Sequence, residues 1–142
     1  MPWPMVHFAV SEELSSGKAS PSLLLGSIAP DAIHARGIIT REEKGFTHLI
    51  HKGKMPTAEM ILMKCREYIE KYSEPESKEF VLGYFSHIYT DLRWTETLYS
   101  DFEQNFKGEG NEIRTKYNEE VSQVEFILLR SMDVWGKSFL KY

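Results

Sequence analysis

The fold is decided by a stretch that runs from Phe80 to Trp94 and reads FVLGYFSHIYTDLRW. Its apolar residues recur at helical spacing, and it places His87 and Asp91 four residues apart. Residues at this spacing lie on the same face of a helix, so the imidazole and the carboxylate should point the same way. Burying such a pair among aromatic rings is costly unless something balances it. Two explanations fit: both groups bind a metal ion, or a buried hydrogen bond between them merely orients a core histidine.

The apolar periodicity elsewhere in the chain is also helical, and no segment alternates convincingly as a β-strand does. The helix with His87 is expected to begin with Ser77 as its cap and to continue towards Phe106. Other helices are expected from Pro4 to Leu14, from Thr57 to Tyr72 and from Ile113 to Leu128. A short apolar run after Pro21 is expected to break over residues 26–31, because the residue before Pro30 is pushed out of the helical region. An aromatic segment from Asp133 to Tyr142 ends the chain. The sequence therefore predicts an all-α, single-domain bundle of about five helices.

Length and composition are those of an ordinary soluble domain. The chain has 142 residues, a net charge of -4, 42% hydrophobic and 27% charged residues. The charge gives no basic surface for nucleic acid, and no apolar stretch is long enough to span a bilayer. Without a signal peptide either, a cytoplasmic location is expected. The single cysteine, Cys65, excludes an internal disulfide framework and is interpreted as a packing residue.

Further candidate ligands are scattered over the first third of the chain. His7 lies on the apolar stripe of the first expected helix, where a histidine is more often a satisfied core residue than a ligand. Asp31 follows Pro30 on a turn, where it either caps the next residues or holds a carboxylate at the edge of the core. The polar segment from Ala32 to Lys54 contains three more histidines, and long connections of this kind are often functional. These three are His34, His48 and His51, of which His48 is preferred.

Four of these segments together resemble a known family. They are His7, the Gly-Ser-Ile-Ala-Pro-Asp sequence of residues 26–31, Phe46-Thr47-His48, and the Gly-Tyr-x-x-His-x-x-x-Asp pattern of residues 83–91. Their order and approximate spacing are similar to those of the zinc-dependent phospholipase C family, which is related to the zinc-dependent single-strand nucleases. The chain looks closest to a short cytoplasmic bacterial branch, in which a Tyr-Asn-x-Glu sequence recurs, here at residues 117–120. The resemblance covers about the first two thirds of the chain.

The resemblance implies a phospholipase C-like domain over residues 1–142, either complete or shortened at its C-terminus. It also implies that Asp31, His48, His87 and Asp91 surround one zinc ion. Asp91 would then bridge towards a second metal that His7 also binds. A mixed imidazole and carboxylate shell without thiolate suits zinc at a hydrolytic site, with manganese or iron as alternatives.

The chain also departs from the family pattern. Secreted members use an N-terminal Trp as a ligand, but Trp3 here follows Met1-Pro2. Thr97 stands near the position of a further family histidine, and no histidine follows His87. Glu96 and Glu125 are weaker candidates to replace the missing ligands, although exposed glutamates on helices are usually solvated. One or two metal ions are therefore expected.

Two functions remain open at this stage. The first is a metal-dependent hydrolase of a small phosphoester, such as a phospholipid or related phosphodiester, with Asp31 or a neighbouring carboxylate accepting a proton from metal-bound water. The second is a non-catalytic bundle that a metal stabilises, or a module that binds a phosphate-bearing ligand without cleaving it. The sequence alone gives neither the substrate nor the oligomeric state.

Overall fold

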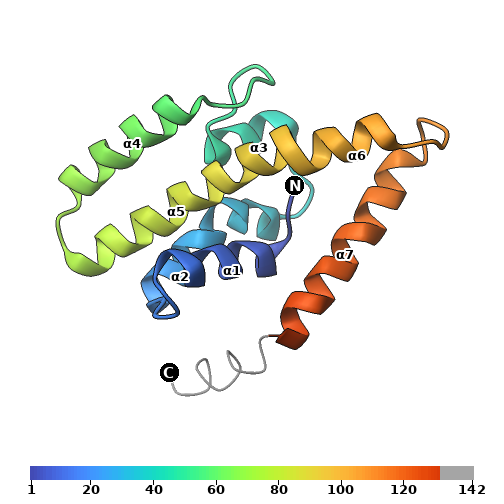
Figure 1. Cartoon of the computed structure of the whole chain (residues 1–142). Helices are drawn as coiled ribbons and strands as arrows, with labels where there is room; N and C mark the ends of the chain where they lie inside the picture. The colour runs from blue at the N-terminus through green and yellow to red at the C-terminus, as the bar shows by residue number, and fades with distance from the viewer. Residues whose placement is uncertain (132–142) are drawn as a thin grey trace.

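The computed structural model describes residues 1–131, and the regular elements of this part of the chain are all helices (Figure 1). The elements in order are α1 (Pro4–Leu14), α2 (Pro21–Ile28), the 3-10 helix η1 (Ala29–Arg36), α3 (Arg41–His48), α4 (Ala58–Lys71), α5 (Pro75–Trp94), the π-helix η2 (Thr95–Tyr99), α6 (Ser100–Asn105) and α7 (Ile113–Ser131). The described residues form no β-strand, only an isolated bridge between His51 and Lys54. The all-α expectation is confirmed. The aromatic segment from Asp133 to Tyr142 lies outside the described residues.

The longest helix is one rod made of α5, η2 and α6. Thr95 and Ser100, at the two junctions, keep right-handed helical dihedrals, so the rod continues from Pro75 to Asn105 as expected. Its predicted start was wrong, because Pro75 occupies the first turn and Glu74, not Ser77, is the N-cap. Proline is tolerated there, since the first turn needs no intrahelical N–H donor.

Counted with this rod as one helix, residues 1–131 contain six α-helices rather than about five. The additional helix is α3, in a segment that was expected to be mainly a polar connection. Thr40 begins α3 with a capping box: its hydroxyl accepts from the Glu43 N–H, while the Glu43 carboxylate accepts from the Thr40 N–H. This Thr-x-x-Glu signal is legible in the sequence, and it positions His48 at the end of the helix.

Two glycines allow α2 and α5 to cross at close range. A Cβ at Gly26 would collide with the backbone of Phe80, and one at Gly83 would collide with the backbone of Leu23. Gly26 therefore lies inside α2, which ends at Ile28, within the expected break over residues 26–31. The reason expected for the break was wrong, because Ala29 keeps helical dihedrals before Pro30 and the chain continues into η1. The crossing brings the η1 turn that follows α2 against α5.

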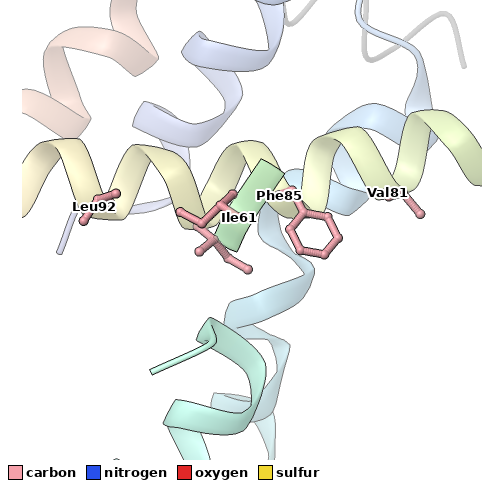
Figure 2. Packing of buried hydrophobic residues seen from close by; sticks show 5 residues of the cluster. Ile61, Val81, Phe85 and Leu92 are labelled. Carbon is pink, nitrogen blue, oxygen red and sulfur yellow. The ribbon is translucent and has the colours of Figure 1, made fainter. Parts of the chain in front are cut away.

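The opposite face of α5 packs on α4. Figure 2 shows Ile61 of α4 against Val81, Phe85 and Leu92 of α5, and Ile88 completes this buried cluster. Cys65 packs at its edge, in line with the structural role expected for it. Each of the large apolar side chains contributes about 1.5–3 kcal/mol by leaving water. The α4 contact thus fixes α5 on one side, while its polar residues face α1, α2 and η1. Among the described helices, none is long and apolar enough to cross a membrane.

Candidate metal centre

The structure gathers five of the predicted site residues from four separate elements. His7 comes from α1, Asp31 from η1, His48 from the last position of α3, and His87 and Asp91 from α5. The three histidines and Asp91 are at most 2% exposed, whereas the side chain of Asp31 is 33% exposed. The cluster is therefore buried on the α5 side and open to solvent at Asp31.

The ring nitrogens and carboxylate oxygens lie close together around a common centre. At Asp91, Oδ1 lies 3.4 Å from His7 Nε2, and Oδ2 lies 3.4 Å from His87 Nε2 and 3.7 Å from His48 Nε2. At Asp31, Oδ1 lies 2.9 Å from His48 Nε2 and Oδ2 lies 3.6 Å from His87 Nε2. Ligands of a tetrahedral zinc at about 2.0–2.2 Å lie roughly 3.3–3.6 Å from one another. Most of the separations are close to this range.

Two overlapping sets of these residues could each hold a metal ion. One set is His48, His87 and Asp91, and the other is His7, Asp31 and His87, with the ligand atoms of each set within 4.8 Å of one another. Both sets contain His87, and an imidazole nitrogen facing the centre binds one ion at a time. The geometry therefore suits one well-supplied position more readily than two independent ones.

Two of the histidines are oriented by hydrogen bonds from the nitrogen that faces away from the centre. His87 Nδ1 lies 2.6 Å from the carbonyl oxygen of Ser27. His48 Nδ1 lies 3.1 Å from the carbonyl oxygen of Lys44 and 2.8 Å from the hydroxyl of Thr47. A carbonyl can only accept, so these contacts favour a proton on each Nδ1, and a bound cation could then use the lone pair of each Nε2. Without a cation, His48 Nε2 lies within hydrogen-bond distance of Asp31 Oδ1, at 2.9 Å. Metal-binding histidines are typically held in this way.

Several buried polar atoms in or beside the cluster lack a hydrogen-bond partner among residues 1–131. They are both ring nitrogens of His7, Nε2 of His87, Oδ1 of Asp91 and the hydroxyl of Ser11. Leaving such an atom unpaired costs about 1–3 kcal/mol. The orienting hydrogen bond between His87 and Asp91, considered as an alternative to a metal, is not formed with acceptable geometry. A cation bound at the centre would satisfy the ring nitrogens and the carboxylate together.

The pKa values of two stacked imidazoles, those of His7 and His87, are shifted in opposite directions. The rings of His7 and His87 lie 3.6 Å apart at an angle of 12°. Burial lowers the pKa of His7 more than Asp91 raises it, so the net shift is downward. Burial also lowers the pKa of His87, but the carboxylates of Asp91 and Asp31 more than offset this, so its pKa is raised. The stacked pair thus holds a proton on His87 in preference to His7 when no metal is bound.

The two carboxylates are kept ionised by the same neighbours. Burial raises the pKa of Asp91, but the attraction of the His7 and His87 imidazoles, each 3.4 Å away, outweighs this and holds the pKa far below its ordinary value. For Asp31 the burial effect is likewise outweighed by His48 and His87, and its pKa is lowered. Both groups are therefore anionic at neutral pH, as metal ligands must be.

The weaker candidates stand outside the cluster. His34 reaches only its edge, with Nε2 3.9 Å from Asp31 Oδ1 and about half of its side chain exposed. His51 is exposed and pairs through its backbone with Lys54. The carboxylate of Glu96 lies 3.3 Å from the guanidinium of Arg93, and Glu125 accepts from the N–H of Met5 at 3.0 Å. Neither glutamate replaces the family ligands that are missing after Asp91.

Two neighbouring features were not predicted from the sequence. Ser11 is fully buried one turn after His7, on the same face of α1. Tyr117, in the Tyr-Asn-x-Glu sequence, accepts a hydrogen bond from the Met1 amine at 2.8 Å and another from Trp94 Nε1 at 2.5 Å. Burial lowers the pKa of this amine. The helical spacing of His7 and Ser11 was visible, but the contact between Met1 and Tyr117 joins residues too far apart for any local pattern.

No family model matches the chain, and no curated protein or solved structure matches it either. The resemblance of its four motifs to the zinc-dependent phospholipases C therefore stays a hypothesis. The geometry of the cluster is the evidence for a metal centre.

Proposed function

We propose that this protein is a metal-dependent hydrolase of phosphoesters, with zinc as the preferred ion. The observation that carries the proposal is the buried set of three imidazoles and two carboxylates. Two of its imidazoles are held by carbonyls on one side and turn a lone pair towards the centre on the other. Such a donor set without thiolate is typical of hydrolytic zinc sites. The phosphoester class comes from the resemblance of the motifs around these residues to the zinc-dependent phospholipases C.

The buried residues of the cluster would bind the metal, and the partly exposed Asp31 would also act on the substrate. The ligands would be His48, His87 and Asp91, with Asp31 completing the set and His7 beside Asp91. A bound zinc ion supplies a water of lowered pKa and withdraws charge from a phosphoryl oxygen. Asp31 is the carboxylate that a substrate can reach from solvent, and its lowered pKa keeps it ionised, as a proton acceptor must be.

The partial exposure of Asp31 favours catalysis over a purely structural metal. Structural zinc sites are closed by four protein ligands, whereas catalytic ones keep a position for water or substrate. Four of the five residues are buried, so access exists on the Asp31 side of the cluster. A phosphoester would approach across η1, where His34 also lies.

The test measures hydrolysis of chromogenic phosphodiesters, phospholipids, nucleotides and single-stranded nucleic acid by the zinc-loaded protein. His87→Ala and Asp91→Ala should each lower the rate about a thousandfold or more, because the activated water is lost. Asp31→Asn should lose activity while it still binds zinc, since an amide cannot accept the proton. His51→Ala, which changes an exposed histidine outside the cluster, should leave the rate unchanged.

A non-catalytic metal domain is the second candidate, and one observation favours it. The ligands that the family carries after the helix Asp are missing, and both glutamates that were considered in their place have other partners. If the wild-type protein binds zinc but turns over none of these substrates, and Asp31→Asn has no effect beyond weaker binding, the metal serves the fold alone.

A further inference from the structure

A cavity of about 630 Å³ lies between α4, α5 and α3, separate from the candidate metal centre. Ligand-binding pockets typically have volumes of about 300–1,000 Å³. Its walls are mostly aromatic: Tyr68 of α4 and Tyr72 directly after it, Phe80 and Tyr84 of α5, and Phe46 of α3. None of the five clustered histidines and aspartates lines it. The cavity is therefore a second site and not an extension of the first.

The shape of the cavity is elongated along α5. Its lining on this helix begins at Glu76 and ends at Phe85, with a contact on every turn in between. At a rise of 1.5 Å per residue, this stripe is roughly 14 Å long. A ligand that fills it would be a chain or a narrow ring system rather than a compact molecule.

The aromatic walls are more exposed than packing alone requires. Phe46 is 78% exposed, Tyr72 44% and Phe80 39%. Contiguous exposed apolar surface on a soluble protein often marks a binding site. The hydroxyl of Tyr84 already donates to the carbonyl oxygen of Thr47 at 2.6 Å, so the Tyr84 ring is fixed in the wall. The groove thus offers a firm apolar surface with few polar atoms.

Charge decides which end group the groove accepts. Among residues 1–131, Glu76 is the one charged residue in the lining, at the end where α5 begins, and no lysine or arginine of this part of the chain lines the groove. Its carboxylate offsets the attraction that the positive end of the α5 dipole would have for an anion. Lys71, the neighbouring base, lies over the Tyr72 ring at 5.4 Å. A ligand carboxylate placed at the Glu76 end would therefore meet a like charge.

We propose that this groove binds an elongated, uncharged apolar molecule, such as a long-chain alcohol, and rejects the corresponding carboxylate. The apolar part lies along α5 between the aromatic side chains, and the uncharged polar end lies near Glu76. The proposal does not depend on the function of the metal centre.

The experiment uses the full chain and the uncharged fluorescent probe N-phenyl-1-naphthylamine, displaced at pH 8 by 1-octanol, 1-decanol or decanoate below its micellar concentration. Saturable probe binding is expected, with displacement by 1-decanol. Each added methylene should tighten binding about fourfold. Decanoate should bind at least tenfold more weakly than 1-decanol. Absence of saturable binding, or equal affinity for the two, would overturn the proposal.

Matched variants locate the binding. Phe80→Ala should weaken 1-decanol binding tenfold or more, whereas Tyr89→Ala, which removes a similarly exposed ring from the same helix outside the groove, should not. Glu76→Gln should improve decanoate binding without changing that of 1-decanol, and Glu79→Gln should change neither. Equal effects of Phe80→Ala and Tyr89→Ala would contradict the assignment. A dimer in light scattering that Phe80→Ala abolishes would assign the groove to a second copy of the chain and also refute the proposal.

Discussion

The stacked pair of His7 and His87 shows how single residues set the chemistry of the cluster. Their rings lie 3.6 Å apart, which makes simultaneous protonation unfavourable. Asp91 lies 3.4 Å from both Nε2 atoms, yet only His87 has a raised pKa. The two rings therefore divide the roles: His87 takes the proton without metal, and His7 stays neutral.

This division predicts a titration that nuclear magnetic resonance of the imidazole groups can follow. In chelated protein, His87 should titrate above the ordinary value of about 6.5 and His7 below it. Because the His87 pKa is raised in the folded state, its contribution to stability is complete below about pH 6.5 and is lost as the pH rises through the raised value. His7 has a lowered pKa in the folded state, so acidification through the ordinary histidine range lowers the stability of the fold at this residue. Zinc should remove the His87 proton in the neutral range; titration of both rings near 6.5 in apo protein would contradict this assignment.

At the same scale, the sequence predicted some site residues directly and others only by resemblance. His87 and Asp91 followed from a four-residue spacing on one helix, which is a local property. His7 and Asp31 could not be chosen from local pattern, because their roles depend on how α1 and η1 pack against α5. Ser11 escaped attention because a buried serine resembles any other polar residue until its neighbours are known.

The site also depends on whole elements, and α3 is the clearest case. This helix has only eight residues and ends at His48, so its start must be secured by the capping box of Thr40 and Glu43. A short helix without its cap frays readily, since most of its stability comes from its ends and its contacts.

Thr40→Ala should therefore lower the free energy of unfolding by about 1 kcal/mol and also weaken zinc binding. Thr57→Ala is the matched control, because Thr57 caps α4 in the same way, with its hydroxyl accepting from the N–H of Met60. It should cost similar stability without changing zinc affinity. Chemical denaturation and zinc titration measure the two effects. Equal zinc affinities for both variants would show that α3 does not position His48.

The crossing of α2 and α5 makes a second prediction about elements. Gly26→Ala would force a Cβ into the backbone of Phe80, so the two helices must separate. The expected cost is about 1–3 kcal/mol or more, with a weakened metal centre because Asp31 follows α2 and His87 lies on α5. Gly110→Ala is the control, since a Cβ there meets nothing within 4 Å. Thermal melting compares them, and equal melting temperatures would contradict the close crossing.

The sequence predicted the main helices well but their limits less well. The α5 rod followed from unbroken apolar periodicity, whereas residues 26–31 were taken as a break because the residue before Pro30 was expected to leave the helical region. Gly26 in fact lies inside α2. This glycine is needed because α5 packs against it, and that contact cannot be predicted from the local sequence. Helix α3 was hidden in a polar segment, because it buries only a few side chains.

Across the whole molecule, the cluster ties together helices that have few apolar contacts in common. Elements α1, η1, α3 and α5 each supply a residue of the cluster, whereas the buried apolar cluster joins mainly α4 and α5. Without a cation, the unpaired ring nitrogens and carboxylate oxygen must be tolerated inside the fold. Metal binding should therefore be coupled to the stability of the bundle.

Zinc at a hundredfold excess over its dissociation constant should add about 2.7 kcal/mol to the free energy of unfolding. For a chain of this length, this corresponds to a rise in melting temperature of roughly 5–10 °C. Differential scanning calorimetry with zinc and with chelator measures it. Asp91→Ala should lose the zinc-dependent rise, whereas His51→Ala should retain it. The same melting temperature for wild-type protein under both conditions would show that no metal is linked to folding.

The most direct measurement is anomalous X-ray diffraction at the zinc edge from crystals grown with zinc. The predicted result is a peak between His48, His87 and Asp91, within bonding distance of their facing nitrogen and oxygen atoms, with Asp31 beside it. The absence of a peak there at full zinc occupancy in solution, or peaks only at exposed side chains such as His51, would contradict the metal centre.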